Sequence, residues 1–94
     1  MPMKFEWDER KNEINIRKHG FDFRDAREVF DGPLLVRLDQ REDYGEDRWQ
    51  GIGLIRGQVV VLIFTQRDLE VIRVISVRKA TKHEREGFEK ALQD

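Results

Sequence analysis

The sequence predicts a single α+β domain over residues 1–94 in the order β-α-α-β-β-β-β-α, with an antiparallel sheet packed by two N-terminal helices. Three observations lead to this fold class. One short alternating segment precedes two helix-like segments, four strand-like segments follow, and a last amphipathic segment ends the chain. A length of 94 residues suits one hydrophobic core. The 38% of hydrophobic and 39% of charged residues indicate a small core under a densely charged surface.

The N-terminal part is expected to form a strand and two helices. Residues Lys4–Trp7 alternate polar and apolar side chains, the pattern of a half-buried strand. Asp8 is the expected N-cap of a helix over 9–19, whose end the following glycine favours. Asp22 is the expected N-cap of a second helix that runs to about Phe30. The apolar stripe of this second helix consists of Phe23, Ala26, Val29 and Phe30.

Four strands are expected next, at Leu34–Asp39, Arg48–Ile55, Gln58–Gln66 and Glu70–Val77. Short turns separate the last three, which predicts an antiparallel meander. The run Val59–Phe64 lacks alternation, as is typical of a central strand covered on both faces. Gly51 and Gly53 lie inside a strand pattern and indicate an adaptation of that strand or a bulge.

A long loop and a last helix complete the expected elements. The acidic stretch Gln40–Asp47 is the longest predicted loop. Thr81 and Glu84 are spaced as a capping box, which predicts the start of a helix. Phe88, Ala91 and Leu92 form a narrow apolar strip on that helix.

Composition argues against several classes of protein. The chain has no cysteine, so disulfides, thiolate zinc sites and a cysteine nucleophile are excluded. The longest apolar run is too short to span a bilayer and no secretory signal pattern begins the chain, so we expect a cytoplasmic protein with no membrane contact. Neither a metal-binding motif nor a glycine-rich phosphate loop is present, so no metal or cofactor is expected.

Charge leaves a local nucleic-acid site open. The net charge of −1 argues against a protein that coats nucleic acid without specificity. Basic residues nevertheless outnumber acidic ones in residues 48–94. The cations placed on predicted strands or turns are Arg48 entering a strand, Arg67 in a hairpin turn, Arg73 in the last strand, and Arg78 with Lys79 at its end.

Arg78 and Lys79 together could clamp a phosphate, because a guanidinium donates to two oxygens and lysine adds a point charge. Alternation of the last strand places Arg78 on the same face as Ile72, Val74 and Ser76. The alternative is that such strand-end arginines pair with nearby carboxylates.

The helices carry further candidates. His83 and Glu84 lie close to Arg78 in sequence and could act as an acid–base pair. The alternatives are a solvated histidine and a glutamate committed to the capping box. In the first helix, the residues Lys11, Asn15 and Lys18 share one face, which is either solvated or a docking face for a polar partner. His19 is interpreted as a favourable cation at a helix C-terminus.

Two groups of residues resemble the signatures of a known family. The first comprises Trp7-Asp8-Glu9, Lys11, Asn15, Lys18-His19-Gly20, Phe23 and Ala26. The second comprises Tyr44-Gly45-Glu46-Asp47-Arg48, Gly53, Val61, Thr65, the run from Arg73 to Ala80, and Glu84-Arg85-Glu86. Both are similar to the BrnT toxins of bacterial type II toxin–antitoxin systems. The two signatures stand in the expected order over nearly the whole chain, which makes the resemblance specific.

The resemblance implies a RelE-like fold and a ribonuclease that halts translation. It also implies a BrnA-type antitoxin with a ribbon-helix-helix part, so that the complex represses its own operon and operator DNA is bound only through the antitoxin. We expect the antitoxin to contact the loop Gln40–Asp47 or the helix over 9–19. The alternative function is a non-catalytic binding module that acts with a DNA-binding antitoxin in autorepression.

A metal-independent endoribonuclease can activate the 2′-hydroxyl of RNA, free or on the ribosome, to attack the adjacent phosphate. The residues expected to serve catalysis are Arg48, Arg67, Arg78, Lys79, His83 and Glu84. Those expected to bind substrate are Lys11, Lys18, His19 and Arg73. These cations are expected to converge on one pocket. Relatives often carry tyrosine where this chain has Phe88, so no phenol can act at that position.

Overall fold

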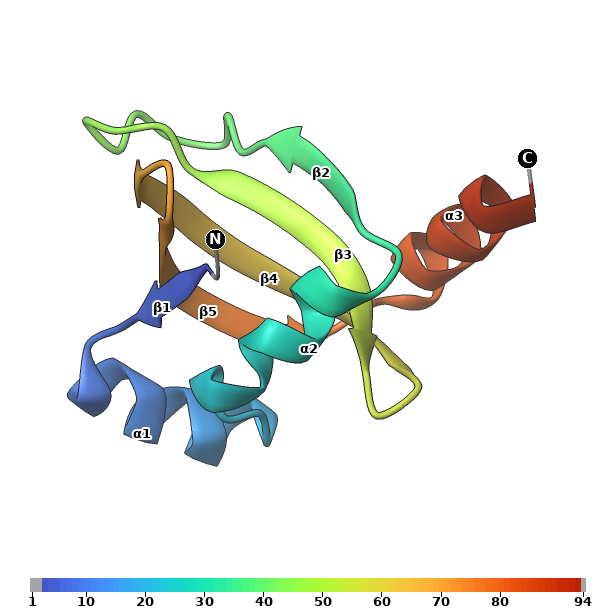
Figure 1. Ribbon diagram of the computed structural model, residues 1–94. Helices are drawn as coiled ribbons and strands as arrows, with labels where there is room; N and C mark the ends of the chain where they lie inside the picture. The colour runs from blue at the N-terminus through green and yellow to red at the C-terminus, as the bar shows by residue number, and fades with distance from the viewer. Residues whose placement is uncertain (1–2, 94) are drawn as a thin grey trace.

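The computed structural model describes residues 3–93 and shows a five-stranded mixed sheet with helices on both faces (Figure 1). The strands are β1 (Lys4–Glu6), β2 (Leu35–Leu38), β3 (Trp49–Ile55), β4 (Gln58–Asp68) and β5 (Val71–Lys79), in the spatial order β1-β5-β4-β3-β2. The helices are α1 (Glu9–His19), α2 (Ala26–Asp31) and α3 (Lys82–Gln93). The predicted α+β class is confirmed. None of the helices described has the length and apolar character needed to cross a membrane.

The direction of β1 differs from the prediction of an antiparallel sheet. β1 pairs with β5 in parallel, whereas β2, β3, β4 and β5 pair with their neighbours in antiparallel fashion. The alternation in Lys4–Trp7 determines which side chains share a face, but it contains no information on the partner strand or its direction. Pairing with β5 brings together segments that lie at opposite ends of the chain.

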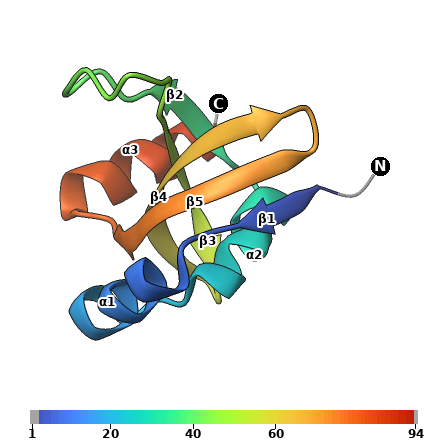
Figure 2. The ribbon, with the colours of Figure 1, turned by 90° about the vertical axis from the view of Figure 1, so that its left-hand side faces the viewer.

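The two faces of the sheet carry separate cores (Figure 2). One face packs against α2 and the 3₁₀ turn before it, and this α2 core includes Phe23, Val29, Leu62, Phe64, Val74 and Val77. The other face packs against α3, and this α3 core consists of Val59, Val61, Ile63, Ala80 and Phe88. Residues 59–65 of β4 are buried without interruption, which confirms the prediction of a central strand covered on both faces.

The ends of the first two helices follow the predicted caps. The Asp8 side chain accepts a hydrogen bond from the backbone N–H of Lys11 at 3.1 Å. Gly20 ends α1 with φ +79°, a left-handed conformation that glycine adopts at little cost. Asp22 caps a 3₁₀ turn over Phe23–Asp25 before α2 begins, so the predicted second helix is divided in two.

Candidate functional site

A β-bulge in β5 decides the direction of the cationic side chains on that strand. In the pairing of β4 with β5, Ile63 lies opposite Ser76 and Phe64 lies opposite Val74. Ile75 is therefore an extra residue on β5. A bulge of this kind interrupts the alternation of faces along a strand.

The bulge moves Arg78 to the face of the sheet on which α3 packs, here called the α3 face. Val74 and Val77 both belong to the α2 core although they are three residues apart. Arg78 lies opposite Val61, which belongs to the α3 core. The expectation that Arg78 shares a face with Val74 is therefore wrong, because uninterrupted alternation was assumed.

Four side chains lie in a row across the α3 face, from β1 to the start of β3: Glu6, Arg73, Thr65 and Arg48. We call them the cationic row because two of the four are arginines. Register places Arg73 between Glu6 and Thr65. The pairing of Trp49 with Phe64 brings the preceding residue, Arg48, next to Thr65. Phe64 packs in the α2 core, so alternation directs its neighbour Thr65 to the opposite face.

Two buried polar atoms in the cationic row, Nε of Arg48 and Oγ1 of Thr65, have no hydrogen-bond partner among residues 3–93. The Arg48 guanidinium lies over the Tyr44 ring, 4.1 Å from its centroid, and its Nε is 3.8 Å from Oε2 of Glu46. Buried polar atoms in native proteins nearly always bind a partner. These two groups therefore keep hydrogen-bonding capacity that no described residue uses.

Glu6 is shared by two arginines of neighbouring strands. Nη1 of Arg73 lies 2.8 Å from Oε2 of Glu6, and Nε of Arg67 lies 3.8 Å from the same oxygen. One carboxylate thus faces two guanidinium groups, and the charge of Arg73 also acts on the nearby Asp8. Arg67 lies in β4 and not in a hairpin turn as expected, because β4 extends to Asp68.

Arg78 is held by α3 through a bidentate ion pair. Its Nη1 and Nη2 donate to the two carboxylate oxygens of Glu84 at 2.8 and 2.9 Å. Glu84 also accepts from the N–H of Thr81, and its own N–H donates to the Thr81 hydroxyl, which confirms the capping box. Hydrogen bonds from Arg78, followed by those from Thr81, lower the pKa of Glu84 to about 2. The same bonds raise the pKa of Arg78.

A hollow of about 210 Å³ lies between α1 and β5. Its lining includes the side chains of Lys11, Lys18 and His19 around Ile14 and Ser76. Burial lowers the pKa of His19 from its ordinary 6.5, and the charges of Lys18 and Arg78 lower it further. These effects all disfavour the charged imidazole, which counts against the interpretation of His19 as a cation at the helix terminus.

The match to known proteins agrees with this geometry. A family model described as the ribonuclease toxin, BrnT, of type II toxin–antitoxin systems matches residues 7–84. The chain belongs to the BrnT family. It is also similar to the 1.1 Å crystal structure of the ribonuclease toxin BrnT from Brucella abortus, with 35% sequence identity and a TM-score of 0.66. That match covers 85% of this chain and 99% of the Brucella chain. No curated protein sequence matched the chain.

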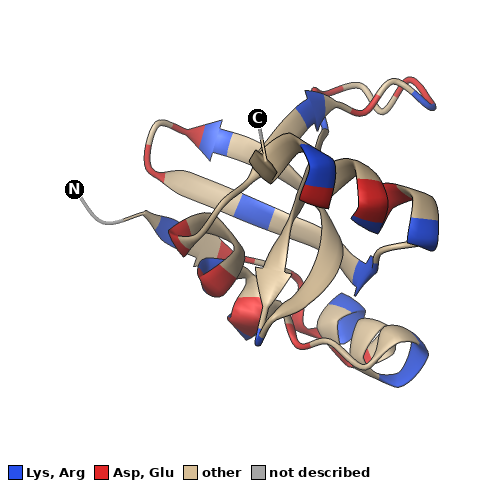
Figure 3. Ribbon diagram, turned by 90° about the vertical axis from the view of Figure 1, so that its right-hand side faces the viewer, with Lys and Arg blue, Asp and Glu red and all other residues tan. Residues whose placement is uncertain are grey.

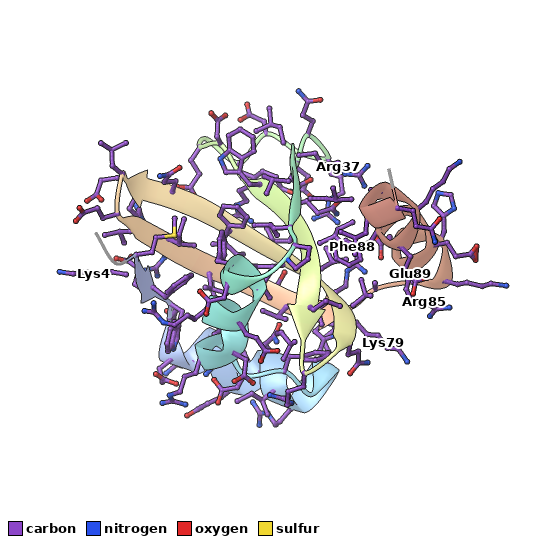
Figure 4. All side chains as sticks on the ribbon, turned by 45° about the vertical axis from the view of Figure 1, so that its right-hand side comes forward. Lys4, Arg37, Lys79, Arg85, Phe88 and Glu89 are labelled. Atoms are coloured by element: carbon purple, nitrogen blue, oxygen red, sulfur yellow. The ribbon has the colours of Figure 1, made fainter. Side chains whose placement is uncertain are left out.

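Membership of the BrnT family identifies a ribonuclease toxin, and a type II toxin has an antitoxin as its partner. The candidate residues of this BrnT chain do not line one pocket, so the expected convergence is wrong. Arg48 lines a hollow with the acidic loop, whereas Lys11, Lys18 and His19 line the hollow beside α1. Lys79 lines a third hollow, with Arg85 and Glu89 of α3 (Figure 4). His83 is exposed in the first turn of α3.

Asn15 has a structural role, so it does not belong to a solvated or docking stripe. Its side chain accepts from the N–H of Val77 at 3.2 Å and donates to the Val77 carbonyl at 2.9 Å, beyond the end of β1. Asn12 is buried beside it and accepts from the N–H of Phe23 at 2.8 Å. The Asn15 amide binds free backbone groups at the edge of β5, and the Asn12 amide holds the turn after α1. The buried residues of α1 are these two asparagines, so α1 contacts β5 through amide side chains and not through an apolar face.

Sequence reasoning did not assign Glu6, Tyr44 or Thr65 to the site. The alternation of Lys4–Trp7 does place Glu6 opposite the buried face, but its position beside Arg73 depends on the parallel pairing of β1. Thr65 follows a run of apolar residues in the central strand, and a polar residue at that position was the signal that could have assigned it to the site. Among residues 3–93, no three histidine or acidic side chains come together as a metal site.

Proposed function

We propose that this BrnT chain is a metal-independent endoribonuclease that cleaves RNA and thereby inhibits translation, with the phosphate backbone bound along the cationic row. The observation that carries the proposal is the pair of unpartnered buried atoms, Arg48 Nε and Thr65 Oγ1, between Arg73 and Tyr44. A phosphate oxygen is an acceptor for both the guanidinium and the hydroxyl.

The chemistry starts from the RNA itself. The 2′-oxygen attacks the phosphorus of the adjacent phosphodiester, and its proton passes to a basic side chain. The bond from phosphorus to the 5′-oxygen breaks, and that oxygen takes up a proton. The products are a cyclic 2′,3′-phosphate and a free 5′-hydroxyl. Negative charge gathers on the phosphoryl oxygens in the transition state, so guanidinium groups held on strands stabilise it.

The proton acceptor is chosen by pKa and by availability from the predicted pair, His83 and Glu84, and from His19, which was expected only to bind substrate. Glu84 has a pKa of about 2, and both of its oxygens accept from Arg78, so it is a poor proton acceptor near pH 7. His19 has a lowered pKa and lines a hollow with Lys11 and Lys18. Ser76 of this hollow lies on the α3 face of β5, as Arg73 does, so we propose that the RNA extends from the cationic row to the hollow and that His19 transfers the proton there. The exposed His83 is the alternative. Lys11 and Lys18 bind the adjoining phosphates.

The proposal includes the partner and the setting. The antitoxin is a BrnA-type ribbon-helix-helix protein, and operator DNA binds only through it. The mode of action is RelE-like, on RNA that is free or on the ribosome in the cytoplasm. The single observation that supports a translation target is the ribonuclease description of the family.

The test compares RNA cleavage by wild type, Arg73→Gln and Arg27→Gln. Arg73 belongs to the cationic row, whereas Arg27 is on α2 at the opposite face, where its guanidinium lies 4.8 Å from the Phe5 ring centroid. We expect Arg73→Gln to lower the cleavage rate about 10²–10³-fold, as for loss of one donor to a developing oxyanion. Arg27→Gln should cleave as wild type does.

The same assay assigns the base, because His19→Gln should slow cleavage and His83→Gln should not. End-group analysis should find a cyclic phosphate, and cleavage should persist in EDTA. Equal losses for Arg73→Gln and Arg27→Gln would overturn the placement of the substrate. A wild-type chain that leaves RNA intact would support the alternative of a non-catalytic module.

A further inference from the structure

Strand β2 forms an outer edge of the sheet, and three of its four exposed residues are apolar. Its residues Leu35, Val36 and Leu38 are 38%, 48% and 37% exposed. The opposite edge is formed by β1, which has three residues and presents Lys4 and Glu6. Exposed edge strands readily pair with another chain, so proteins commonly shorten or charge them. β2 has four residues and a single charged side chain, Arg37, among three exposed apolar ones.

The register of β2 defines which backbone groups are free. The N–H of Asp39 donates to the carbonyl of Arg48 at 2.7 Å. Antiparallel pairs alternate between hydrogen-bonded and non-hydrogen-bonded residues. Arg37 and Leu35 therefore bond to β3, whereas Val36 and Leu38 direct their N–H and C=O groups to the open side.

An apolar hollow of about 300 Å³ adjoins this edge on the α2 side of the sheet. Its lining includes Val36 of β2 together with Trp49, Phe64, Phe30 and Ile72. The hollow is large enough for an apolar side chain from a strand added beside β2. Strand addition of this kind gains affinity from main-chain hydrogen bonds and specificity from pockets for alternate side chains.

Negative charge predominates at both ends of β2, although Arg41 of the following loop pairs with Asp39. Asp31 precedes the strand, and the loop between β2 and β3 carries the acidic residues Asp39, Glu42, Asp43, Glu46 and Asp47 (Figure 3). A symmetric pair of β2 strands runs antiparallel and would bring Asp31 of one copy toward the acidic loop of the other. A second copy of this chain is therefore disfavoured, whereas a partner with lysine or arginine at both ends of its strand is complementary.

We infer that the antitoxin binds by adding an extended segment to the free edge of β2, with an apolar side chain in the hollow and basic residues against Asp31 and the acidic loop. The inference rests on the proposed function for the identity of the partner. The added strand lies beside Arg37, whose Nε donates to the Gln50 side chain at 2.7 Å on the α3 face. Bound there, the antitoxin extends the sheet next to the RNA-binding face.

The test compares this chain purified alone with the same chain purified in complex with the antitoxin encoded in the same operon. In hydrogen exchange, the amides of Val36 and Leu38 should exchange quickly in the free chain and at least about fivefold more slowly in the complex, because each gains a backbone hydrogen bond worth about 1 kcal/mol. The amide of Arg37 already bonds to β3 and should change much less.

Leu38→Pro removes the outward N–H that the added strand would use, at an edge position where proline is tolerated. We expect it to weaken antitoxin binding about tenfold, from loss of one hydrogen bond and steric conflict. Leu38→Ala keeps the N–H and is the matched control. If Leu38→Pro does not fold, Val36→Lys places a charge in the hollow, with Leu69→Lys at the exposed β4–β5 turn as its control.

Unchanged exchange at Val36 and Leu38, or wild-type antitoxin affinity in Leu38→Pro or Val36→Lys, would overturn the inference. If the β2 amides of the free chain exchange more slowly as the protein concentration rises, the partner at this edge is a second copy of the chain and not the antitoxin. RNA cleavage by the free chain is measured separately. If the chain cleaves RNA but binds its antitoxin elsewhere, only the inference about β2 is contradicted. If it binds the antitoxin at β2 but does not cleave RNA, only the proposed activity is contradicted.

Discussion

Glu84 has two roles at the start of α3, and both are visible in its hydrogen bonds. It closes the capping box with Thr81 and it holds the guanidinium of Arg78 by both oxygens. The side chains of Glu84 and Arg78 are 16% and 31% exposed, so the pair is only partly screened by solvent. The pair thus ties α3 to β5 and sets the orientation of Arg78 on the α3 face.

The stability contributed by this pair should depend on pH. The pKa of Glu84 is about 2 in the folded chain, below its ordinary 4.5, so the unfolded chain takes up the proton first as pH falls. The contribution is full above pH 4.5 and is lost as pH falls toward 2. Glu84→Gln should lower the free energy of unfolding at pH 7 by about 1.5–3 kcal/mol.

Urea denaturation of wild type and Glu84→Gln at a series of pH values measures this difference. Glutamine at the same position can still serve the capping box, so the comparison reports mainly on the ion pair. The two curves should converge as the pH approaches 2. A difference that stays constant from pH 7 to pH 2 would show that the charge of Glu84 is not its source.

At the scale of the element, β3 allows α2 to approach the sheet closely because it carries glycine where they meet. A Cβ built on Gly53 would lie 2.8 Å from Cγ1 of Val29 and 3.2 Å from the Pro33 carbonyl oxygen. A Cβ on Gly51 would lie 3.1 Å from Cδ1 of Leu34. The register of β3 with β4 is continuous, so these glycines adapt the strand to α2 and do not form a bulge.

Two glycine-to-alanine substitutions should therefore have opposite effects. Gly53→Ala forces α2 away from β3 and should lower the free energy of unfolding by about 1–3 kcal/mol. Gly87→Ala lies in α3 with nothing within 4 Å of the new Cβ, and it should raise that free energy by up to about 1 kcal/mol. Thermal and urea unfolding of the two variants measures both. Equal effects of the two substitutions would refute the close packing of α2 on β3.

At the scale of the whole molecule, opposite charges are separated between two surfaces. Cations line the α1 hollow, while the loop between β2 and β3 is acidic and holds Arg48 of the cationic row beside Glu46 and Tyr44. This separation explains how a chain of net charge −1 can present a basic surface to RNA and an acidic one to a protein.

RNA binding should reflect these local cations and not the net charge. The slope of log affinity against log salt should be reduced by about 0.7 for each phosphate contact removed from single-stranded RNA. Lys11→Gln and Lys18→Gln should each have this effect, and Lys90→Gln on α3 should leave the slope unchanged. Fluorescence anisotropy with a short RNA at several salt concentrations measures the slopes. If all three variants share the wild-type slope, the α1 hollow does not bind phosphate.

The sequence by itself determined the features that depend on neighbouring residues. Asp8, Gly20 and the Thr81–Glu84 box mark helix ends because capping acts within one turn, and the run Val59–Phe64 marks the central strand because burial on both faces removes alternation. The two signatures indicate the BrnT family, and the family model confirms that interpretation.

Only the tertiary structure decided how these elements meet. The parallel pairing of β1 with β5 joins Glu6 to Arg73, the bulge at Ile75 turns Arg78 to the α3 face, and Asn15 bonds to Val77 across 62 residues. Such contacts link residues far apart in the chain, and a single extra residue reverses every later side chain in a strand. Local periodicity therefore identifies the cations of the site, whereas the register of the folded sheet determines which carboxylates and hydroxyls lie beside them.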